Sequence, residues 1–372
     1  MRVVSQQGMT LKAWTWMAGM SAVVAMGAPA YGEDPVQYLK DVAITGNIDA
    51  GYQMNLNQPK DTAGDEQPSF GRVFDKNADS FVLHLAELSF VKAPESGGGF
   101  GLVLNYGADV DTIDVTDSKF VQQGYVYLGT GGGSNLKFGK LATLAGAEVI
   151  EGALNYNISR SFLFGYAINF TNTGLRYTYA GVKGLTLVGG INNGWNISGG
   201  NEDDNYGKTI EAQVGYSLGD LGALVVNGMY GPESSAVGHD TRTLIDVVAT
   251  IKPMDGLTFV LNFDSGSQTN GVALGEDAAW TGYAVYANYA FTDTTSATVR
   301  AESLDDGDAF VFAAGQPITM SEVTLTVSHK VGGIDWRAEY RYDKSDEDVF
   351  LDDKGELKAS QSTIAFAGYY VF

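Results

Sequence analysis

The stretch VAITGNIDAGYQMNL, residues 42–56, alternates between two kinds of side chain. Its even-numbered positions, from Val42 to Leu56, are apolar, aromatic or glycine, whereas its odd-numbered positions, from Ala43 to Asn55, are small or polar. Successive side chains of a β-strand point to opposite faces of the sheet. A period of two over this length therefore predicts one long strand with an apolar face and a polar face.

The same alternation recurs along the chain. In IDWRAEYRY (334–342), for example, Trp336 and Tyr340 fall on one side while Arg337 and Arg341 fall on the other. A soluble β-sandwich alternates in the same way, so the periodicity alone does not distinguish a soluble from a membrane β-protein. Further examples are TIEAQVGYSL (209–218), LTFVLNFD (257–264) and EVTLTVSHK (322–330).

The connections between candidate strands are alternately short and long. Short connections rich in turn residues lie near positions 94, 131, 181, 219, 252, 292 and 331. Long connections are predicted near 57–80, 108–119, 143–169, 194–207, 231–240, 266–278, 303–317 and 344–358. This pattern predicts an all-β protein, a transmembrane antiparallel β-barrel of about 16 strands (range about 14–18), with both termini on the side of the short turns.

The N-terminus and the composition agree with an exported barrel. Arg2 and Lys12 precede an uncharged stretch that ends near Ala30, which predicts a cleaved signal peptide over residues 1–32; an uncleaved membrane anchor is the alternative. The barrel would then occupy residues 33–372. No later run is long and apolar enough for a spanning helix, and the net charge of -21 argues against nucleic acid as a partner. The absence of cysteine excludes disulfides and thiolate metal sites.

The C-terminal stretch QSTIAFAGYYVF, residues 361–372, predicts how the barrel closes. Hydrocarbon offers no partner to an unpaired backbone N–H or C=O, so the last strand must pair with the first. Its alternation turns Ile364 and Phe366 toward lipid and Ala365 and Ala367 inward. Phe372, with Tyr370, resembles the C-terminal signal read by the barrel-assembly machinery. The alternative is an ordinary edge strand that ends on Phe.

A barrel of about sixteen strands is wide enough to hold water, which predicts passive diffusion of ions and small hydrophilic solutes. The loop 143–169 carries Phe162, Phe164, Tyr166 and Phe170, an apolar content unusual for an exposed loop. We therefore expect it to fold into the lumen; a flap on the outside or a bent extra strand pair is the alternative. The predicted pore constriction consists of Glu148, Glu151, Arg160, Arg176, Arg300, Arg337 and Arg341.

Charges of both signs are predicted on the inner wall, and acidic segments at 201–205, 303–310 and 344–356 should draw cations to the mouth. Weak cation preference is the resulting prediction. No catalytic, cofactor or metal site is predicted. The expected partners are outer-membrane lipid and lipopolysaccharide, the barrel-assembly machinery and small solutes, and a homotrimer is compatible with the pattern. The other inward positions are Asp49, Glu211, Arg242, Asp246, Asp264, Glu302, Asp335 and Glu339.

Several ordered blocks resemble the putative β-barrel porin-2 (OmpL-like) proteins of Gram-negative outer membranes. They are residues 74–109, 119–128, 136–179 and 189–196, with looser similarity up to Phe372. The resemblance implies a porin-like fold but no particular solute. Members generally have Tyr before the EVIE block and Ser-Pro after it, where this chain has Ala147, Gly152 and Ala153. Asn169 and Asn172 likewise replace a Pro and a His, which implies a less rigid loop and a different filter.

Two other function classes compete with the channel. A hydrolase on the barrel wall would need a histidine, and the chain has three, His84, His239 and His329, without a G-x-S-x-G elbow. The prediction is therefore that the protein is not an enzyme. A structural or adhesive barrel with acidic surface loops and a plugged lumen would differ from a channel by its lack of conductance.

Overall fold

The computed structural model describes residues 41–114, 118–199, 203, 206–233 and 240–372. The predicted signal peptide (1–32), most of the acidic segment 201–205 and His239 lie outside the described residues. Among the described residues, no helix is long and apolar enough to cross a membrane.

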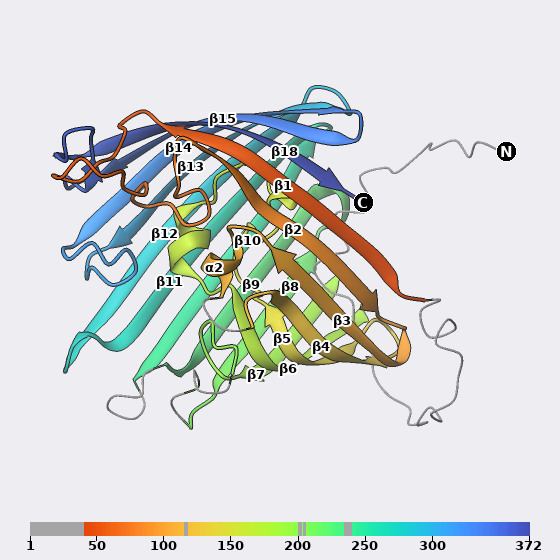
Figure 1. Ribbon diagram of the computed structural model, residues 1–372. Helices are drawn as coiled ribbons and strands as arrows, with labels where there is room; N and C mark the ends of the chain where they lie inside the picture. Colours follow the sequence, from red (N-terminus) through yellow and green to blue (C-terminus); the bar gives the residue numbers. More distant parts are fainter. Residues whose placement is uncertain (1–40, 115–117, 200–202, 204–205, 234–239) are drawn as a thin grey trace.

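Sixteen antiparallel strands form a closed barrel (Figure 1), which confirms the predicted fold class. Each strand pairs with its sequence neighbour, and β1 closes the cylinder by pairing with both β2 and β18. The strands are β1 Ala43–Asn55, β2 Ser80–Lys92, β3 Ser96–Tyr106, β4 Val121–Thr130, β5 Asn135–Ala142, β6 Thr171–Val182, β7 Leu185–Asn192, β8 Thr209–Ser217, β9 Gly222–Pro232, β10 Thr241–Met254, β11 Leu257–Ala273, β12 Glu276–Ala290, β13 Thr295–Asp306, β14 Ile318–Val331, β15 Ile334–Ser345 and β18 Ser360–Val371.

The C-terminal residue completes the closure between β1 and β18. The backbone N–H and C=O of Phe372 each bond Gly46, at 3.0 Å in both directions. The ring of Phe372 lies over Gly46, where a Cβ would sit 2.7 Å from the ring and 2.4 Å from the carbonyl oxygen of Glu87. Position 46 therefore favours glycine, chiefly because the backbone oxygen of Glu87 leaves no room for a Cβ.

The two faces of the wall follow the predicted alternation. On β18, Ile364 and Phe366 are about half exposed on the outside, whereas Ala365 and Ala367 are buried inside. Trp336 of β15 stacks on Phe366, with ring centroids 5.4 Å apart, so aromatic rings on neighbouring strands cover the outer surface together. An apolar outer face is what a barrel needs in order to lie in hydrocarbon.

The long loop predicted at 266–278 is wrong, because β11 and β12 continue through it. Residues Gln268 and Ala278 still pair across the two strands, and only Leu274 and Gly275 connect them. Gly275, the second residue of this turn, has φ 86°, a left-handed conformation that favours glycine. The segment is rich in Ser, Gly, Thr and Asn on both faces, so its composition resembles a loop although its backbone is paired.

The long connections after β1 and β15 lie at the end of the barrel opposite the C-terminus (Figure 1). The connection between β3 and β4 contains the short helix α2, Val110–Ile113. The last one contains a small hairpin of β16, Phe350–Leu351, and β17, Leu357–Lys358. The predicted loop at 303–317 begins only at residue 307, because β13 extends to Asp306.

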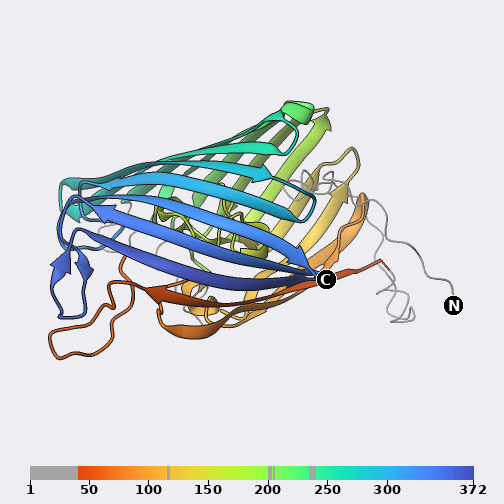
Figure 2. The same ribbon diagram turned by 90° about the horizontal axis from the view of Figure 1, so that it is seen from above.

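The connection between β5 and β6, residues 143–170, is called the inner loop here. It contains a 3-10 turn at Gly152–Leu154 and a π-helical turn at Leu163–Ala167. Figure 2 shows it between the walls of the barrel, coloured yellow-green. The main hydrophobic cluster joins buried side chains of this loop to inward side chains of β9 to β14, so the core of the molecule lies inside the cylinder.

Candidate functional site

The C-terminal half of the inner loop is held by apolar contacts. Phe162, Leu163 and Ala167 have no exposed surface, and they belong to the same cluster as Trp280 of β12. The indole N–H of Trp280 donates to the carbonyl oxygen of Ala167 at 3.0 Å. Burial also raises the pKa of the Tyr166 phenol in this half of the loop. These contacts explain why the loop carries so many aromatic residues.

Two glutamates of the wall accept hydrogen bonds from the backbone of the loop. Glu302 of β13 accepts from the N–H groups of Phe162 and Leu163 at 2.6 and 3.2 Å. Glu339 of β15 accepts from Ile158 and Ser159 at 2.6 and 2.9 Å. A carboxylate that receives two backbone N–H groups fixes both the position and the direction of the segment.

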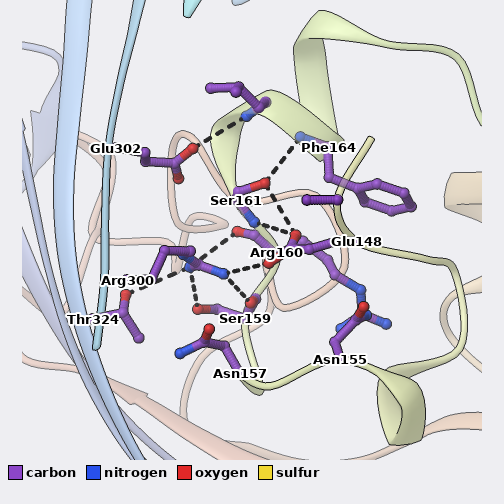
Figure 3. A network of polar contacts seen from close by, with 12 residues as sticks. Glu148, Asn155, Asn157, Ser159, Arg160, Ser161, Phe164, Arg300, Glu302 and Thr324 are labelled. Carbon is purple, nitrogen blue, oxygen red and sulfur yellow. Dashed lines mark hydrogen bonds and ion pairs between the residues drawn. The ribbon is translucent and has the colours of Figure 1, made fainter. Parts of the chain in front are cut away.

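Arg300 of β13 is the centre of this anchor (Figure 3). Its guanidinium donates to Glu148 of the loop at 2.8 Å, to Glu322 of β14 at 2.7 Å and to the carbonyl oxygen of Ser159 at 2.7 Å. The side chain has no exposed surface. Buried charges are tolerated only when they are paired and hydrogen-bonded, and Arg300 meets both conditions.

Two further arginines of β15 hold loop carbonyl groups. Arg341 donates to the carbonyl oxygen of Arg160 at 2.6 Å and to Asp343 at 2.5 Å. Arg337 donates to the carbonyl oxygens of Gly152 and Ala153 at 3.2 and 3.1 Å. Arg300, Arg337 and Arg341, which the sequence places in the constriction, thus lie in a buried anchor between wall and loop.

Glu148 and Arg160 of the loop belong to the same anchor. Glu148 is buried and accepts from the N–H and hydroxyl of Ser161 at 2.7 and 3.0 Å, in addition to Arg300. Arg160 donates to the carbonyl oxygens of Ile150 and Ile158 at 2.6 and 3.0 Å, so it ties the loop to itself. Neither charge is free to face water in this arrangement.

Glu151 lies on the opposite edge of the inner loop, toward β1 to β4. Its carboxylate accepts from the side-chain amide of Gln122 on β4 at 2.6 Å, and it lies within hydrogen-bonding reach of Glu87 on β2. It is half-buried. The inner loop therefore reaches across the lumen from the wall of β10 to β15 to the wall of β2 and β4.

Arg176 of β6 lies at the root of the loop. It forms a bidentate pair with Glu211 of β8 at 2.7 and 2.9 Å and donates to the carbonyl oxygen of Ala142 at 3.0 Å. The pairing fixes the point where the chain leaves β5 for the lumen.

Three charged side chains inside the barrel escape the sequence-based prediction. Glu87 faces inward beside Glu151, but the alternation in FVLHLAELSF is interrupted because the pairing of β1 with β2 shifts between Asp49 and Ala50. Lys137 of β5 is a half-buried cation over the ring of Tyr125, 4.9 Å from its centroid. Arg72, in the first long loop, bonds Asp343 at 3.1 Å. An arginine within a loop gives no periodic signal.

The wall of β7 to β9 differs from the anchored wall. Its inward side chains are mostly small or neutral, and three of them, Thr186, Gln213 and Val225, are half-buried. Inward side chains under the loop, such as Thr324 and Thr326 of β14, are fully buried. Other inward side chains of the β7 to β9 wall, such as Val188, Glu211 and Asn227, are buried, so its accessible side chains are chiefly Thr186, Gln213 and Val225.

Comparison with known proteins agrees with this architecture. The model of the family "Putative beta-barrel porin-2, OmpL-like" matches residues 41–372. The outer membrane channel DcaP of Acinetobacter baumannii is similar, with 14% identity, a TM-score of 0.59 and coverage of 89% of this chain and 97% of that one. No curated protein sequence matches.

Two further solved structures share the fold. The anion-selective porin from Comamonas acidovorans has 14% identity and a TM-score of 0.58, covering 89% of this chain and 99% of that one. A trimer form of OmpT, an outer membrane protein of Vibrio cholerae, has 13% identity and a TM-score of 0.58, with the same two coverages. At these identities the similarity shows the fold.

Proposed function

Because the chain belongs to the putative beta-barrel porin-2, OmpL-like family, we infer that it is an outer-membrane porin for passive diffusion of ions and small hydrophilic solutes. One observation carries the proposal. The inner loop is bound to the wall of β10 to β15 by buried ion pairs, while inward side chains of β7 to β9 stay partly accessible. The water-filled path would then run between the edge of the loop and β7 to β9.

Cysteine labelling tests this path, since the chain has no native cysteine. In Gln213→Cys the thiol should face the water path, so a charged methanethiosulfonate reagent should lower single-channel conductance within minutes. In the matched variant Thr326→Cys the thiol is covered by the inner loop, and conductance should stay unchanged. Equal block of both variants, or of neither, would contradict the proposed path.

In this proposal the water-filled path also extends along the other edge of the inner loop, toward β2 and β4, and the constriction lies there, at Glu151. The buried anchor would shape the pore by holding the loop rather than by facing the solute. Its charged residues are Glu148, Arg160, Arg300, Arg337 and Arg341. Arg176 would act in the same way at the root of the loop. Glu151 and Glu87 are carboxylates without an arginine or lysine within 4.0 Å among the described residues, and they support weak cation preference.

Glu151→Gln should lower the cation-to-anion permeability ratio, because it removes a charge that faces the path. Glu148→Gln should leave the ratio nearly unchanged, because Arg300 already neutralises that carboxylate. Reversal potentials under a gradient of KCl, with a chelator on both sides, measure the ratio. An equal change in the two variants would remove Glu151 from the constriction.

The porin family and fold favour a channel over an enzyme. The two described histidines have other partners: His84 lies 3.1 Å from Asp109, and His329 lies 2.9 Å from the hydroxyl of Thr295 at a short turn. A folded barrel that shows no conductance in a planar bilayer would instead favour the structural or adhesive class.

We also propose a homotrimer, supported by the unequal height of the wall. Strands β5 and β7 have 8 residues each, against 17 in β11. A tilted strand needs about 9–11 residues to span hydrocarbon, so a partner copy would shield the short wall from lipid. Outer-membrane lipid and lipopolysaccharide would surround the tall wall, and the assembly machinery would read Phe372 and Tyr370.

A further inference from the structure

Three inward side chains lie directly opposite one another on the first three strands. Asn47 of β1 pairs in register with Glu87 of β2, and Glu87 pairs in register with Asn105 of β3. Glu151 of the inner loop meets the same point, because its carboxyl group lies within hydrogen-bonding reach of Glu87. Gln122 links the two sides, since its amide donates to Glu151 and its oxygen accepts from the amide of Asn105.

The side chain of Asn47 bonds the carboxyl group of Glu87, but three buried oxygen atoms at this point lack hydrogen-bond donors. They are Oδ1 of Asn47, Oε2 of Glu87 and Oδ1 of Asn105. Asn47 and Asn105 are only 5% and 4% exposed, so water does not reach them freely. A buried acceptor without a donor is unfavourable, and three on adjacent strands point to a missing electropositive partner.

The charges lead to the same conclusion. Among the described residues, neither Glu87 nor Glu151 has a Lys, Arg or His nitrogen within 4.0 Å, whereas Glu148 and Glu322 each have Arg300. Two carboxylates in contact repel each other unless a proton or a cation lies between them. Converging carboxylate and amide oxygens are the ligands that Ca²⁺ prefers.

We propose that Asn47, Glu87, Asn105 and Glu151 form a binding site for one Ca²⁺ ion in the barrel wall. The four side chains supply oxygen ligands only, and water would complete the coordination shell. No three His, Asp or Glu side chains cluster with metal-site geometry in the described ranges, so the amide oxygens are essential to the proposal. The ion would bind the free edge of the inner loop to β1, β2 and β3, opposite the arginine anchor.

Calcium binding to the full chain, folded in detergent and freed of metal with a chelator, tests the site independently of conduction. Equilibrium dialysis with radioactive calcium should show a site that Glu87→Gln and Glu151→Gln each weaken by at least about tenfold, the loss that even an outer-shell partner can cause. Asp353→Asn removes one charge from an exposed acidic loop, and it should leave the site intact. Unchanged binding in both glutamine variants would overturn the proposal.

A variant that should strengthen calcium binding distinguishes loss of the site from damage to the barrel. Asn47→Asp adds a third carboxylate, so it should tighten calcium binding, which a disrupted barrel would not do. Infrared spectra distinguish a cation from a shared proton. If the wild-type protein in calcium keeps a protonated carboxyl band that Glu87→Gln removes, a proton occupies the site and the proposal is wrong.

Discussion

Replacement of Arg300 by methionine is expected to cost about 3–5 kcal/mol of unfolding free energy, because it leaves buried carboxylates without their counter-charge. Glu148 and Glu322 both depend on Arg300, and the carbonyl oxygen of Ser159 loses its donor as well. The loop should detach from β13 and move within the lumen. Denaturant unfolding in detergent measures the loss, and planar-bilayer recording should show larger and noisier current steps.

The double variant Arg300→Met with Glu148→Gln serves as the internal control. It removes one of the carboxylates that lack a counter-charge in Arg300→Met, so part of the lost unfolding free energy should return. The coupling energy of the Arg300–Glu148 pair follows from the double-mutant cycle. Lys330→Met, at an exposed position after the β13–β14 pairing, should change neither stability nor noise. Normal current steps in Arg300→Met would show that the apolar contacts hold the loop without the ion pairs.

The second large effect is expected on β9, where two adjacent valines face opposite sides. Val226 is 39% exposed on the outer face, and Val225 faces the lumen. Val226→Arg should cost about 2–4 kcal/mol in a lipid bilayer, because it places a charge in hydrocarbon near the middle of the strand. Val225→Arg should be tolerated, because the guanidinium can reach water inside the barrel.

Folding into lipid vesicles, followed by guanidinium titration, compares the two valine variants directly. The two variants are matched in residue type, strand and depth. The difference between their unfolding free energies therefore reports only whether the arginine lies on the outer or the inner face of β9. Similar costs for both would mean that the alternation does not separate a lipid face from a water face. Val225→Arg should additionally lower the cation-to-anion permeability ratio if the path borders β9.

The barrel could be predicted from the sequence because alternation is a local property. A strand such as β15 shows its two faces in nine residues, and the alternation of turn and loop fixes the order of the strands. The end of the β11–β12 hairpin was missed because Ser, Gly, Thr and Asn occupy both faces of the two strands there. In this segment the backbone pairing defines the strands, whereas the hydropathy pattern does not.

The candidate site could be predicted only in part, because its contacts join distant strands. Glu148 was selected as a loop charge and Arg300 as an inward charge, but they are 152 residues apart, and their pairing depends on the position of the loop. Sequence alternation shows that an arginine points inward without showing whether water or a carboxylate meets it. The cluster of Asn47, Glu87 and Asn105 depends on a shift in register that no single strand reveals.

The position of the anchor also sets an order of events during assembly. The loop's backbone N–H groups at 158 and 162 take partners that follow them by 181 and 140 residues. Contacts of such high sequence separation form late, so we expect the loop to stay undocked until β13 to β15 are in place. During assembly the barrel would thus pass through a stage with a wide lumen that the inner loop does not yet occupy. The lumen would narrow only when the last hairpins join the wall.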